Sequence, residues 1–307
     1  MALSAETVAV VVVTYNSEDL LADFLTSLDD GLKGVRWHLT VADNASVDNT
    51  VTALRRLAPA ATLIEMGRNA GYAAGINAAV RAARPHSAIL VLNPDVRLMP
   101  GCVAELLGGL RPGTGLVAPQ LLDRQSKLIE SQRREPTVLR AWGDTLLGAR
   151  RAGRYRVLGE VVTDRQCYCR ETVTDWAEGS TLLISAECWQ RCGPWDESFF
   201  LYSEETDFAL RARDADLVTR YVPTAHAVHL EGGSAQSPGL WTLVMLNRIR
   251  LFQRRNGRIR TVAYWAALVS REASRAMLGK ATSRAAVKAL ISPRRLHEPR
   301  GPHSVRV

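Results

Sequence analysis

The chain has 307 residues, of which 47% are hydrophobic, and a formal net charge of +8 at pH 7. This length and apolar content suit one large α/β domain with a buried core, and they exclude a low-complexity or disordered chain. No run of eighteen apolar residues occurs, which excludes a membrane-spanning helix. No basic segment followed by an apolar one opens the sequence, so we expect no signal peptide and a cytoplasmic protein.

Charge is divided unevenly along the chain. From Gly232 onward there are fifteen Lys and Arg but two acids, so the preceding part carries a net charge of −5. A nucleic-acid enzyme usually carries its basic patch across the working face, so we expect no nucleic-acid partner. A basic tail with interleaved apolar residues instead suits peripheral contact with the anionic inner face of a cell membrane. The five cysteines lack the spacing of a zinc site and are expected to be reduced thiols.

The first part of the chain alternates continuous apolar runs with segments of helical periodicity. Such runs predict strands buried on both faces, and apolar residues spaced by three and four predict amphipathic helices between them. The predicted strands span residues 8–13, 39–42, 62–66, 88–92 and 115–119. This alternation predicts a doubly wound α/β sheet, in which ligands bind outside the carboxyl ends of the strands.

Polar residues gather directly after three of these strands. Each alone would be an ordinary turn or helix cap, but carboxyl ends of parallel strands share one edge of a sheet, so their coincidence predicts a ligand site. These residues are Thr14 and Asn16, then Asp43 and Asn44, and then Asp95. No glycine-rich phosphate loop follows the first strand, which argues against a nicotinamide cofactor and against nucleotidyl transfer.

Residues 120–173 are polar, rich in arginine and irregular in pattern. Two interpretations are open for this segment: a solvated, mobile insertion, or a loop that meets a phosphorylated acceptor. A turn at 175–180 and a predicted strand at 181–185 follow it.

Three carboxylates, Glu204, Glu205 and Asp207, open a predicted helix after an aromatic segment. Carboxylates that crowd together raise one another's pKa, which suits a general base. The alternative is that they only stabilise a helix N-terminus, where acidic residues are favourable.

Beyond a short predicted strand at 218–222 lies His229, whose imidazole suits either a metal site or the core. In the tail, residues 240–252 and 262–269 predict apolar helix faces with arginines around them. These helices would pack on the domain, contact a second copy in a homodimer, or lie on a membrane surface. We expect residues 293–307 to be disordered.

Four short motifs stand out along the first part of the chain. They are Val-Thr-Tyr-Asn at 13–16, Ala-Asp-Asn-Ala-Ser at 42–46, Arg-Asn-Ala-Gly-Tyr-Ala-Ala-Gly-Ile-Asn at 68–77 and Leu-Asn-Pro-Asp at 92–95. Together they resemble family 2 glycosyltransferases of the GT-A fold, above all the bacterial rhamnosyltransferase-like branch. The motifs come in the family's order and spacing, and the resemblance runs over about residues 8–234.

The resemblance implies a GT-A type sheet, doubly wound and mixed, with flanking helices. It divides the chain into a glycosyltransferase domain at 1–234, a helical basic extension at 235–292 and a tail at 293–307. Within the domain, residues 1–119 would bind the nucleotide-sugar, and residues 120–234 would hold the acceptor and the catalytic base.

On the donor side, the resemblance assigns Asp43 to the nucleotide base, where a carboxylate accepts from a uracil or thymine N–H. Thr14, Tyr15 and Asn16 would line the base and ribose pocket. Further donor contacts are implied for Asn44, Asn69, Gly71 and Asn93. Arg68 is open to two interpretations, a phosphate contact or a solvated loop charge.

The resemblance also implies a divalent cation, Mg²⁺ or Mn²⁺. Asp95 corresponds to the last Asp of the family's Asp-x-Asp motif, in which Asn93 takes the first position. His229 corresponds to a further metal ligand.

On the acceptor side, the resemblance implies contacts from Trp176 and Gly179. Asp175 is open to two interpretations, a contact with the donor sugar or the acceptor, or a structural role in the turn. Glu205 takes the place of the second acid in the family's Glu-Asp-x-Asp motif and is therefore the implied base. Glu204 and Asp207 are the alternative bases.

The implied activity is an inverting, metal-dependent transfer of a sugar from a dTDP- or UDP-sugar to an acceptor hydroxyl. The preferred donor is dTDP-L-rhamnose. The preferred acceptor is a lipid-linked saccharide or a cell-surface glycan precursor, in polysaccharide or cell-wall biosynthesis. The alternatives are galactofuranosyl or another hexosyl transfer, decoration of a small natural product, and a non-catalytic membrane-associated scaffold of the same fold.

Overall fold

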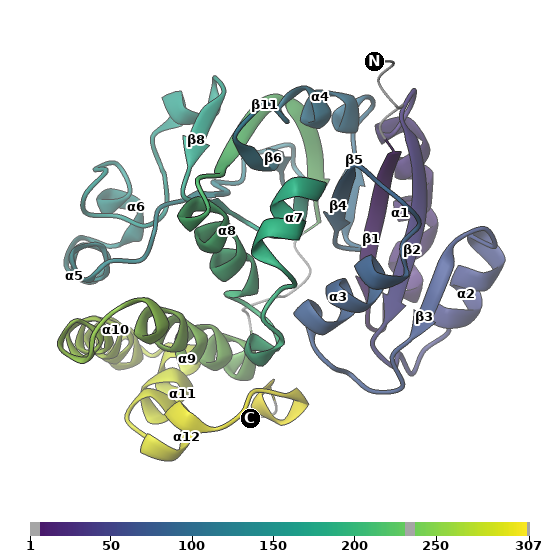
Figure 1. Cartoon of the computed structure of the whole chain (residues 1–307). Helices are drawn as coiled ribbons and strands as arrows, with labels where there is room; N and C mark the ends of the chain where they lie inside the picture. Colours follow the sequence, from purple (N-terminus) through teal and green to yellow (C-terminus); the bar gives the residue numbers. More distant parts are fainter. Residues whose placement is uncertain (1–6, 231–236, 306–307) are drawn as a thin grey trace.

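The computed structural model describes residues 7–230 and 237–305, so the expected domain end at residue 234 lies outside the described part. A nine-stranded sheet runs through the molecule and is flanked by helices (Figure 1). Its order is β3–β2–β1–β4–β10–β6–β11–β5, with β8 paired to β11. These strands are β1 Thr7–Thr14, β2 Arg36–Asp43, β3 Thr62–Glu65, β4 Ala88–Leu92, β5 Val96–Leu98, β6 Thr114–Leu122, β8 Thr172–Thr174, β10 Thr181–Ser185 and β11 Val218–His229.

Parallel pairing brings the ends of β1, β2 and β4 to one edge of the sheet. β1 lies between β2 and β4, parallel to both, and Thr14 is in register with Asp43. Asn93 and Asp95 follow the end of β4 at the same edge. β10 is antiparallel to both β4 and β6, which makes the sheet mixed. The predicted doubly wound mixed sheet is confirmed.

The inner strands are buried on both faces because nearly all their side chains are apolar. Val8, Val10 and Val12 pack toward α1, α2 and α4, while Ala9 and Val11 pack toward α3, α7 and α8 on the other face. The helices of these two layers are α1 Glu18–Gly31, α2 Thr50–Leu57, α3 Tyr72–Ala82, α4 Cys102–Gly108, α7 Ala186–Cys192 and α8 Glu204–Asp214. The short 3-10 segment η2, Glu197–Phe199, precedes α8.

The segment after β6, for which an irregular insertion was one interpretation, forms regular elements. It contains α5 Val138–Leu147, α6 Ala149–Ala152 and the 3-10 segment η1 Arg165–Tyr168. β7 Gln132–Arg133 pairs with β9 Trp176–Ala177 in a small second sheet. This pairing ties the two ends of the segment together beside α8.

The C-terminal helices pack on the domain instead of standing free. They are α9 Pro238–Arg255, α10 Arg258–Met277, α11 Ala281–Leu290 and α12 Pro293–His297, followed by the 3-10 segment η3 Pro302–Val305. Leu246, Ile249 and Phe252 of α9 share a core with α10, α11 and Ala141 of α5. Packing on the domain, one of the three interpretations of these helices, is therefore confirmed for α9.

Two further expectations concern the tail and its relation to membranes. The disorder expected over 293–307 is wrong for residues 293–305, because α12 and η3 occupy them and Arg300 donates to Asn247 of α9 at 3.2 Å. Among the described helices, none is both long and apolar enough to cross a membrane. All five cysteines are free thiols, as expected.

Candidate active site

A cavity of about 400 Å³ lies where the start of α8, the β9–β10 turn, the end of β11 and α9 meet. Six of the predicted site residues line it, namely Asn93, Trp176, Gly179, Glu204, Glu205 and His229. The cavity thus joins residues expected on the donor side to those expected on the acceptor side. It is the natural place for the reacting ends of two substrates.

The loop before α8 has an unusual backbone that aims the carboxylates into this cavity. Phe200, Tyr202 and Ser203 have φ values of 66°, 70° and 75°, a region that residues with a Cβ rarely adopt. The side-chain amide of Asn247, which is fully buried in α9, shares its N–H groups among the carbonyls of Phe199, Leu201 and Tyr202 at 2.8, 2.9 and 3.1 Å. The buried amide holds the loop in this conformation.

Glu205 has the acid strength expected of a general base. Burial raises its pKa to about 7, with Glu178 adding to the rise and backbone N–H groups opposing it. Burial and the neighbouring Glu205 raise the pKa of Glu204 well above its usual range. At neutral pH, Glu205 is therefore the member of this pair that is poised to accept a proton.

Asp207 is placed differently from the other two carboxylates of α8. Its Oδ2 accepts from the Arg211 guanidinium at 2.8 Å, one helical turn away. It does not line the cavity. Its role as an alternative base is therefore poorly supported by its position.

His229 lies between two carboxylates at the end of β11. Its Nδ1 is 2.9 Å from Glu178 Oε1, and its Nε2 is 3.4 Å from Asp95 Oδ2. Burial alone would lower the pKa of His229, but the two carboxylates raise it to about 10. Burial alone would raise the pKa of Glu178, but His229 lowers it below its ordinary value.

The pair Asp95 and His229 fits a small divalent cation in part. Their facing atoms are 3.4 Å apart, close to the roughly 3 Å between adjacent ligands of an octahedral ion bound at about 2.1 Å. Neither ring nitrogen of His229 has a well-aligned hydrogen bond, although the ring is buried. Among the described residues, no group of three or more His, Cys, Asp or Glu is arranged to hold a metal alone. A bound ion would need oxygen atoms from the substrate or water.

At the donor edge, Asp43 is buried and holds two loops together. Its Oδ1 accepts from Thr14 Oγ1 at 2.8 Å and from Ser46 Oγ at 2.6 Å, and its Oδ2 accepts from the Ser46 N–H at 2.9 Å. Asn16, at φ 50°, accepts from the Val47 N–H at 2.8 Å. Tyr15 beside it is half exposed. These residues lie together as expected, outside the main cavity.

The glycine-containing loop before α3 contacts protein where we expected the nucleotide-sugar. A Cβ on Gly71, which has φ 95°, would lie 2.4 Å from the Phe200 carbonyl, and the Tyr72 N–H donates to that carbonyl at 2.7 Å. Glycine is required because this loop packs against the loop that leads to Glu205. Asn44 Nδ2 in turn donates to the Gly71 carbonyl at 3.0 Å.

The positions of Asn69, Arg68 and Asn93 neither support nor exclude a donor contact. Asn69 Oδ1 accepts from the Gly71 N–H at 3.1 Å, a local turn contact. Arg68 is exposed. Asn93 lines the cavity, and its Oδ1 accepts from the Tyr72 hydroxyl at 2.6 Å.

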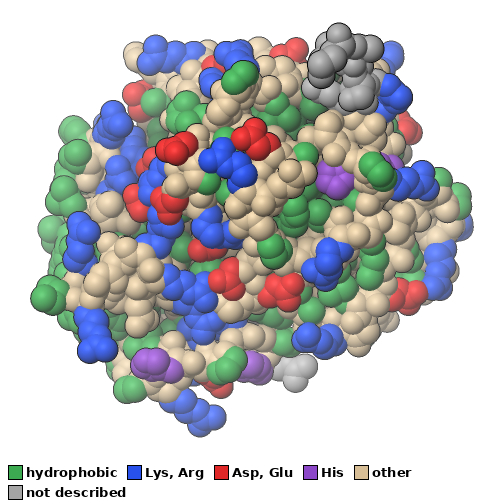
Figure 2. Space-filling model, viewed as in Figure 1, with side chains coloured by type: hydrophobic (Ala, Val, Ile, Leu, Met, Phe, Trp, Pro, Cys, Tyr) green, Lys and Arg blue, Asp and Glu red, His purple; other side chains and the backbone are tan. Residues whose placement is uncertain are grey.

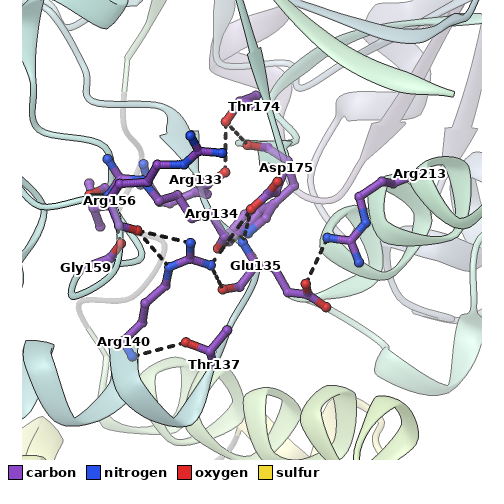
Figure 3. Close-up of polar contacts among 12 residues, drawn as sticks. Arg133, Arg134, Glu135, Thr137, Arg140, Arg156, Gly159, Thr174, Asp175 and Arg213 are labelled. Atoms are coloured by element: carbon purple, nitrogen blue, oxygen red, sulfur yellow. Dashed lines mark hydrogen bonds and ion pairs between the residues drawn. The ribbon is translucent and has the colours of Figure 1, made fainter. Parts of the chain in front are cut away.

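Asp175 belongs to a polar network that lies outside the main cavity (Figure 3). Its Oδ2 accepts from the Glu135 N–H at 2.7 Å and is 3.9 Å from Arg140 Nη1. The Glu135 carboxylate accepts from Arg213 of α8 at 2.9 Å. The position of Asp175 fits the turn role better than an acceptor contact.

Trp176 and Gly179 do reach the cavity. The Trp176 indole N–H donates to the Arg134 carbonyl at 3.1 Å, which fixes the ring, and the Arg133 guanidinium lies 5.9 Å from the ring centre. A Cβ on Gly179 would lie 3.1 Å from Glu205 Cβ. A larger residue in the β9–β10 turn would therefore press against Glu205.

Several cavity residues were not predicted from the sequence. They are Tyr72, Arg133, Glu178, Tyr202, Trp241 and Arg248. Glu178 adjoins the predicted Gly179, and this adjacency was the one available signal. Arg248 reaches the cavity from α9 and forms an ion pair with the buried Glu160, and nothing in the sequence joins those two residues.

Comparison with known proteins places the first part of the chain in a family. The model of the family described as "Glycosyl transferase family 2" matches residues 9–170, more than half of the chain. The N-acetylglucosaminyl-diphospho-decaprenol L-rhamnosyltransferase of Mycobacterium tuberculosis is 28% identical over 241 residues, which cover 72% of this chain and 75% of that protein. The low-salt glycan biosynthesis hexosyltransferase Agl10 of Haloferax volcanii is 27% identical over 230 residues, which cover 72% and 66%.

Solved structures of lower identity share the architecture. The mannosyltransferase PcManGT from Pyrobaculum calidifontis, in complex with GDP-Man and Mn²⁺, has a TM-score of 0.57 and 18% identity, covering 94% of this chain and 81% of that chain. S. aureus TarS 1-349 has a TM-score of 0.53 and 13% identity, covering 92% and 90%. At these identities the likeness shows the fold alone, and it confirms the expected GT-A type fold.

Proposed function

We propose that this chain, which belongs to glycosyl transferase family 2 and is a nucleotide-sugar-dependent glycosyltransferase, moves L-rhamnose from dTDP-L-rhamnose to a hydroxyl of a lipid-linked saccharide. The rhamnosyltransferase of Mycobacterium tuberculosis supports this choice of donor, and its name gives a diphospho-decaprenol acceptor. The observation that carries the proposal is Glu205 in the cavity, with a pKa raised to about 7.

Glu205 would act as the base of an inverting transfer. The acceptor hydroxyl loses its proton to the Glu205 carboxylate while its oxygen attacks the anomeric carbon of the donor sugar. The attack comes from the face opposite the nucleoside diphosphate, which departs with the electron pair of the broken C–O bond. One bond forms as one breaks, so the anomeric configuration inverts.

Asp95 and His229 would hold Mg²⁺ or Mn²⁺ together with donor phosphate oxygens, and Glu178 would fix the His229 ring through Nδ1. When bound, the ion offsets the charge that develops on the departing diphosphate. The PcManGT structure contains GDP-Man and Mn²⁺ on the same fold, which supports the use of a divalent ion.

The donor nucleotide would lie at the edge formed by Thr14, Tyr15, Asn16 and Asp43. For Asp43 to bind the base, its carboxylate would exchange one of its present hydrogen bonds, such as that from Ser46 Oγ, for the base N–H. Asn69 and Arg68 lie in the loop that follows β3, within the same donor half.

The acceptor would occupy the side of the cavity lined by Trp176, Trp241, Arg133 and Arg248. Indole rings offer flat apolar faces to sugar rings, and the Arg133 guanidinium can donate to a phosphate oxygen, whereas both Nη groups of Arg248 already donate to Glu160. This combination suits a saccharide that carries a phosphate.

The test is a transfer assay with a panel of nucleotide-sugars and an acceptor bearing N-acetylglucosamine on a short prenyl diphosphate. Thermal shift of the protein with each nucleotide-sugar, with Mg²⁺ or Mn²⁺ present, ranks the donors first. We expect dTDP-L-rhamnose to give the largest shift and the fastest transfer. A larger response to a UDP-hexose would overturn the rhamnose assignment.

Transfer of another hexose is the second candidate, and it is favoured by the relative from Haloferax volcanii, which is named a hexosyltransferase. The same panel separates the two candidates. A non-catalytic scaffold is disfavoured because such a protein would not need Asp95 and His229 paired as metal ligands, or Glu205 in the cavity. We also propose that the C-terminal helices contact either a membrane or a second copy in a homodimer. Ile259 and Val262, exposed at the start of α10, are the candidate residues for either contact.

A further inference from the structure

The segment that joins α5 to η1 carries an exposed surface of mixed arginine and apolar side chains. We call it the α5–α6 face; it comprises Leu146, Leu147, Arg150, Arg151, Arg154, Tyr155, Arg156 and Val157, all of them exposed. In Figure 2, basic and hydrophobic side chains alternate along the left margin, where Figure 1 places α5, α6 and α10. Residues 145–159 contain no Asp or Glu.

The four arginines of this face lie within seven consecutive residues, and no acid lies among them. Among the described residues, none forms a hydrogen bond or ion pair with the guanidinium of Arg150, Arg151, Arg154 or Arg156. Some exposed or half-exposed arginines elsewhere do pair, such as Arg55 with Glu65 and Arg111 with Glu171. What sets this face apart is therefore the clustering of its arginines. A cluster of like charges without acids destabilises a folded surface unless something anionic covers it.

Apolar side chains stand between these charges. Leu146 is 74% exposed, Val157 60% and Tyr155 58%. Apolar groups interleaved with arginines are typical of protein surfaces that lie in the headgroup region of a bilayer. Neither feature alone indicates that arrangement, because single exposed apolar residues are ordinary.

Other arginines hold the backbone beneath the face, so the exposed side chains project from a fixed backbone (Figure 3). Arg134 Nη1 donates to the Gly159 carbonyl at 2.8 Å, and Arg140 Nη2 donates to the Arg156 carbonyl at 3.1 Å. The guanidinium groups of Arg134 and Arg140 thus hold the loop that carries these exposed residues.

We propose that the α5–α6 face docks on the surface of an anionic lipid bilayer. Its four free cations complement anionic headgroups, and its apolar side chains reach the level of the acyl chains. A second copy of this chain would bring the same unpaired arginines together in a twofold contact. A nucleic acid would match the charge but not the leucine and valine side chains.

A second cavity has lining residues from both this face and the active site. It has a volume of about 480 Å³, and Ala149 and Arg150 line it together with Arg133 and Glu178, which also line the catalytic cavity. A lipid-linked acceptor held in the bilayer would then enter from the docked side. This last step rests on the proposed function; the docking itself does not.

The test is co-sedimentation of the full chain with vesicles of phosphatidylcholine, with and without about a third of phosphatidylglycerol. The charge variant is Arg151→Gln, Arg154→Gln and Arg156→Gln. The matched control, Arg36→Gln, Arg81→Gln and Arg84→Gln, removes the same charge from exposed arginines elsewhere. An apolar variant, Leu146→Ser with Val157→Ser, separates lipid contact from polyanion binding when heparin is used as a soluble competitor. Thermal unfolding checks that each variant is folded.

We expect the wild type to bind the anionic vesicles and the charge variant to bind roughly 100-fold more weakly, since each basic residue near an anionic surface contributes about a fivefold gain. The control should bind as the wild type does, and the apolar variant should lose vesicle binding while it keeps heparin binding. No binding by the wild type, or equal losses in the charge variant and the control, would overturn the docking. The sedimentation assay contains no nucleotide-sugar, so its result does not depend on the proposed function. A failure to transfer sugar to a water-soluble acceptor, measured separately, would count against the proposed function and not against the docking.

Discussion

The side-chain amide of Asn247 lies 3.1 Å from the carbonyl of Tyr202, three residues before Glu205. A residue of the C-terminal extension thereby fixes the loop that aims the proposed base. Three non-glycine residues of this loop have positive φ, so without such support it would relax toward ordinary backbone angles.

Asn247→Leu should lower transfer more than it lowers donor binding. Leucine fills the same space but leaves three carbonyls without their donor, which should cost about 2–4 kcal/mol of unfolding free energy and let the loop move. We expect kcat to fall roughly tenfold or more with the donor KM nearly unchanged. Asn256→Leu, at the asparagine that directly follows α9, is the control, and it should change neither kcat nor the donor KM. Unaltered kcat in Asn247→Leu would show that the loop holds without this amide.

Glu205→Gln should abolish transfer while the donor still binds. The amide keeps the size of the side chain but cannot accept the acceptor proton, so we expect a loss of roughly 1,000-fold in kcat. Asp207→Asn serves as the comparison, because Asp207 is paired with Arg211 and lies off the cavity. If the Asp207 variant is the inactive one, the base has been assigned to the wrong carboxylate.

The pH dependence of kcat/KM should report the ionisation of Glu205. Burial raises its pKa to about 7, so below that pH the carboxyl is protonated and kcat/KM should fall about tenfold per pH unit. The same shift favours the protonated folded form. The contribution of Glu205 to stability should therefore be greatest below its ordinary pKa of 4.5 and decline as pH rises to about 7. Urea unfolding of the wild type and of Glu205→Gln at pH 5 and pH 8 checks the sign: the variant should lose less stability between the two. A flat kcat/KM profile between pH 5.5 and 8 would contradict the prediction.

Gly179→Ala should impair catalysis through one methyl group. The new Cβ would lie 3.1 Å from Glu205 Cβ and 3.2 Å from its Cγ, so the base must shift by a few tenths of an ångström. We expect kcat to fall roughly tenfold, with a melting temperature within a few degrees of the wild type. Gly108→Ala, where the added Cβ meets nothing within 4 Å, is the matched control. Equal kcat values in the two variants would mean that Glu205 has room to spare.

Asp95→Asn should weaken metal-dependent binding of the donor nucleotide. Titration calorimetry of dTDP with and without Mn²⁺ measures this, and we expect the gain from Mn²⁺ to drop roughly tenfold because one charged ligand is lost. Asp19→Asn, an exposed carboxylate at the start of α1, is the control. Mn²⁺-dependent heats that match the wild type would remove Asp95 from the metal site.

The sheet could be predicted because its signal is local. The apolar runs at 8–13 and 88–92 are continuous and lie between turn residues, and the structure places β1 and β4 over them. The elements of residues 120–173 could not be predicted, because the apolar residues of this segment recur with neither helical nor strand spacing. Its elements form because β7 pairs with β9 and α5 packs on α10, partners that lie 43 or more residues away.

The site divides in the same way. Asp95, Glu205 and His229 could be chosen from motifs, and the structure brings Glu205 and His229 to one cavity, with Asp95 beside His229. Glu178 and Asn247 could not, because what marks them is a contact with a residue about 45–50 positions away. Gly71 was expected to let the backbone approach the nucleotide-sugar closely. The structure shows that the backbone of Gly71 approaches Phe200 closely.

The link between Asn247 and the base loop also bears on how this enzyme can be recombined with its relatives. The family match ends at residue 170, before both the base loop and α9. A chimera that exchanges residues 1–119 would leave the base, the β9–β10 turn and the supporting amide in one piece. A junction placed between β11 and α9 would separate this loop from the helix whose Asn247 holds it. The loop before Glu205 and the C-terminal helices should therefore be inherited together, and an exchange of residues 1–119 must keep the contacts of Gly71 and Tyr72 with Phe200.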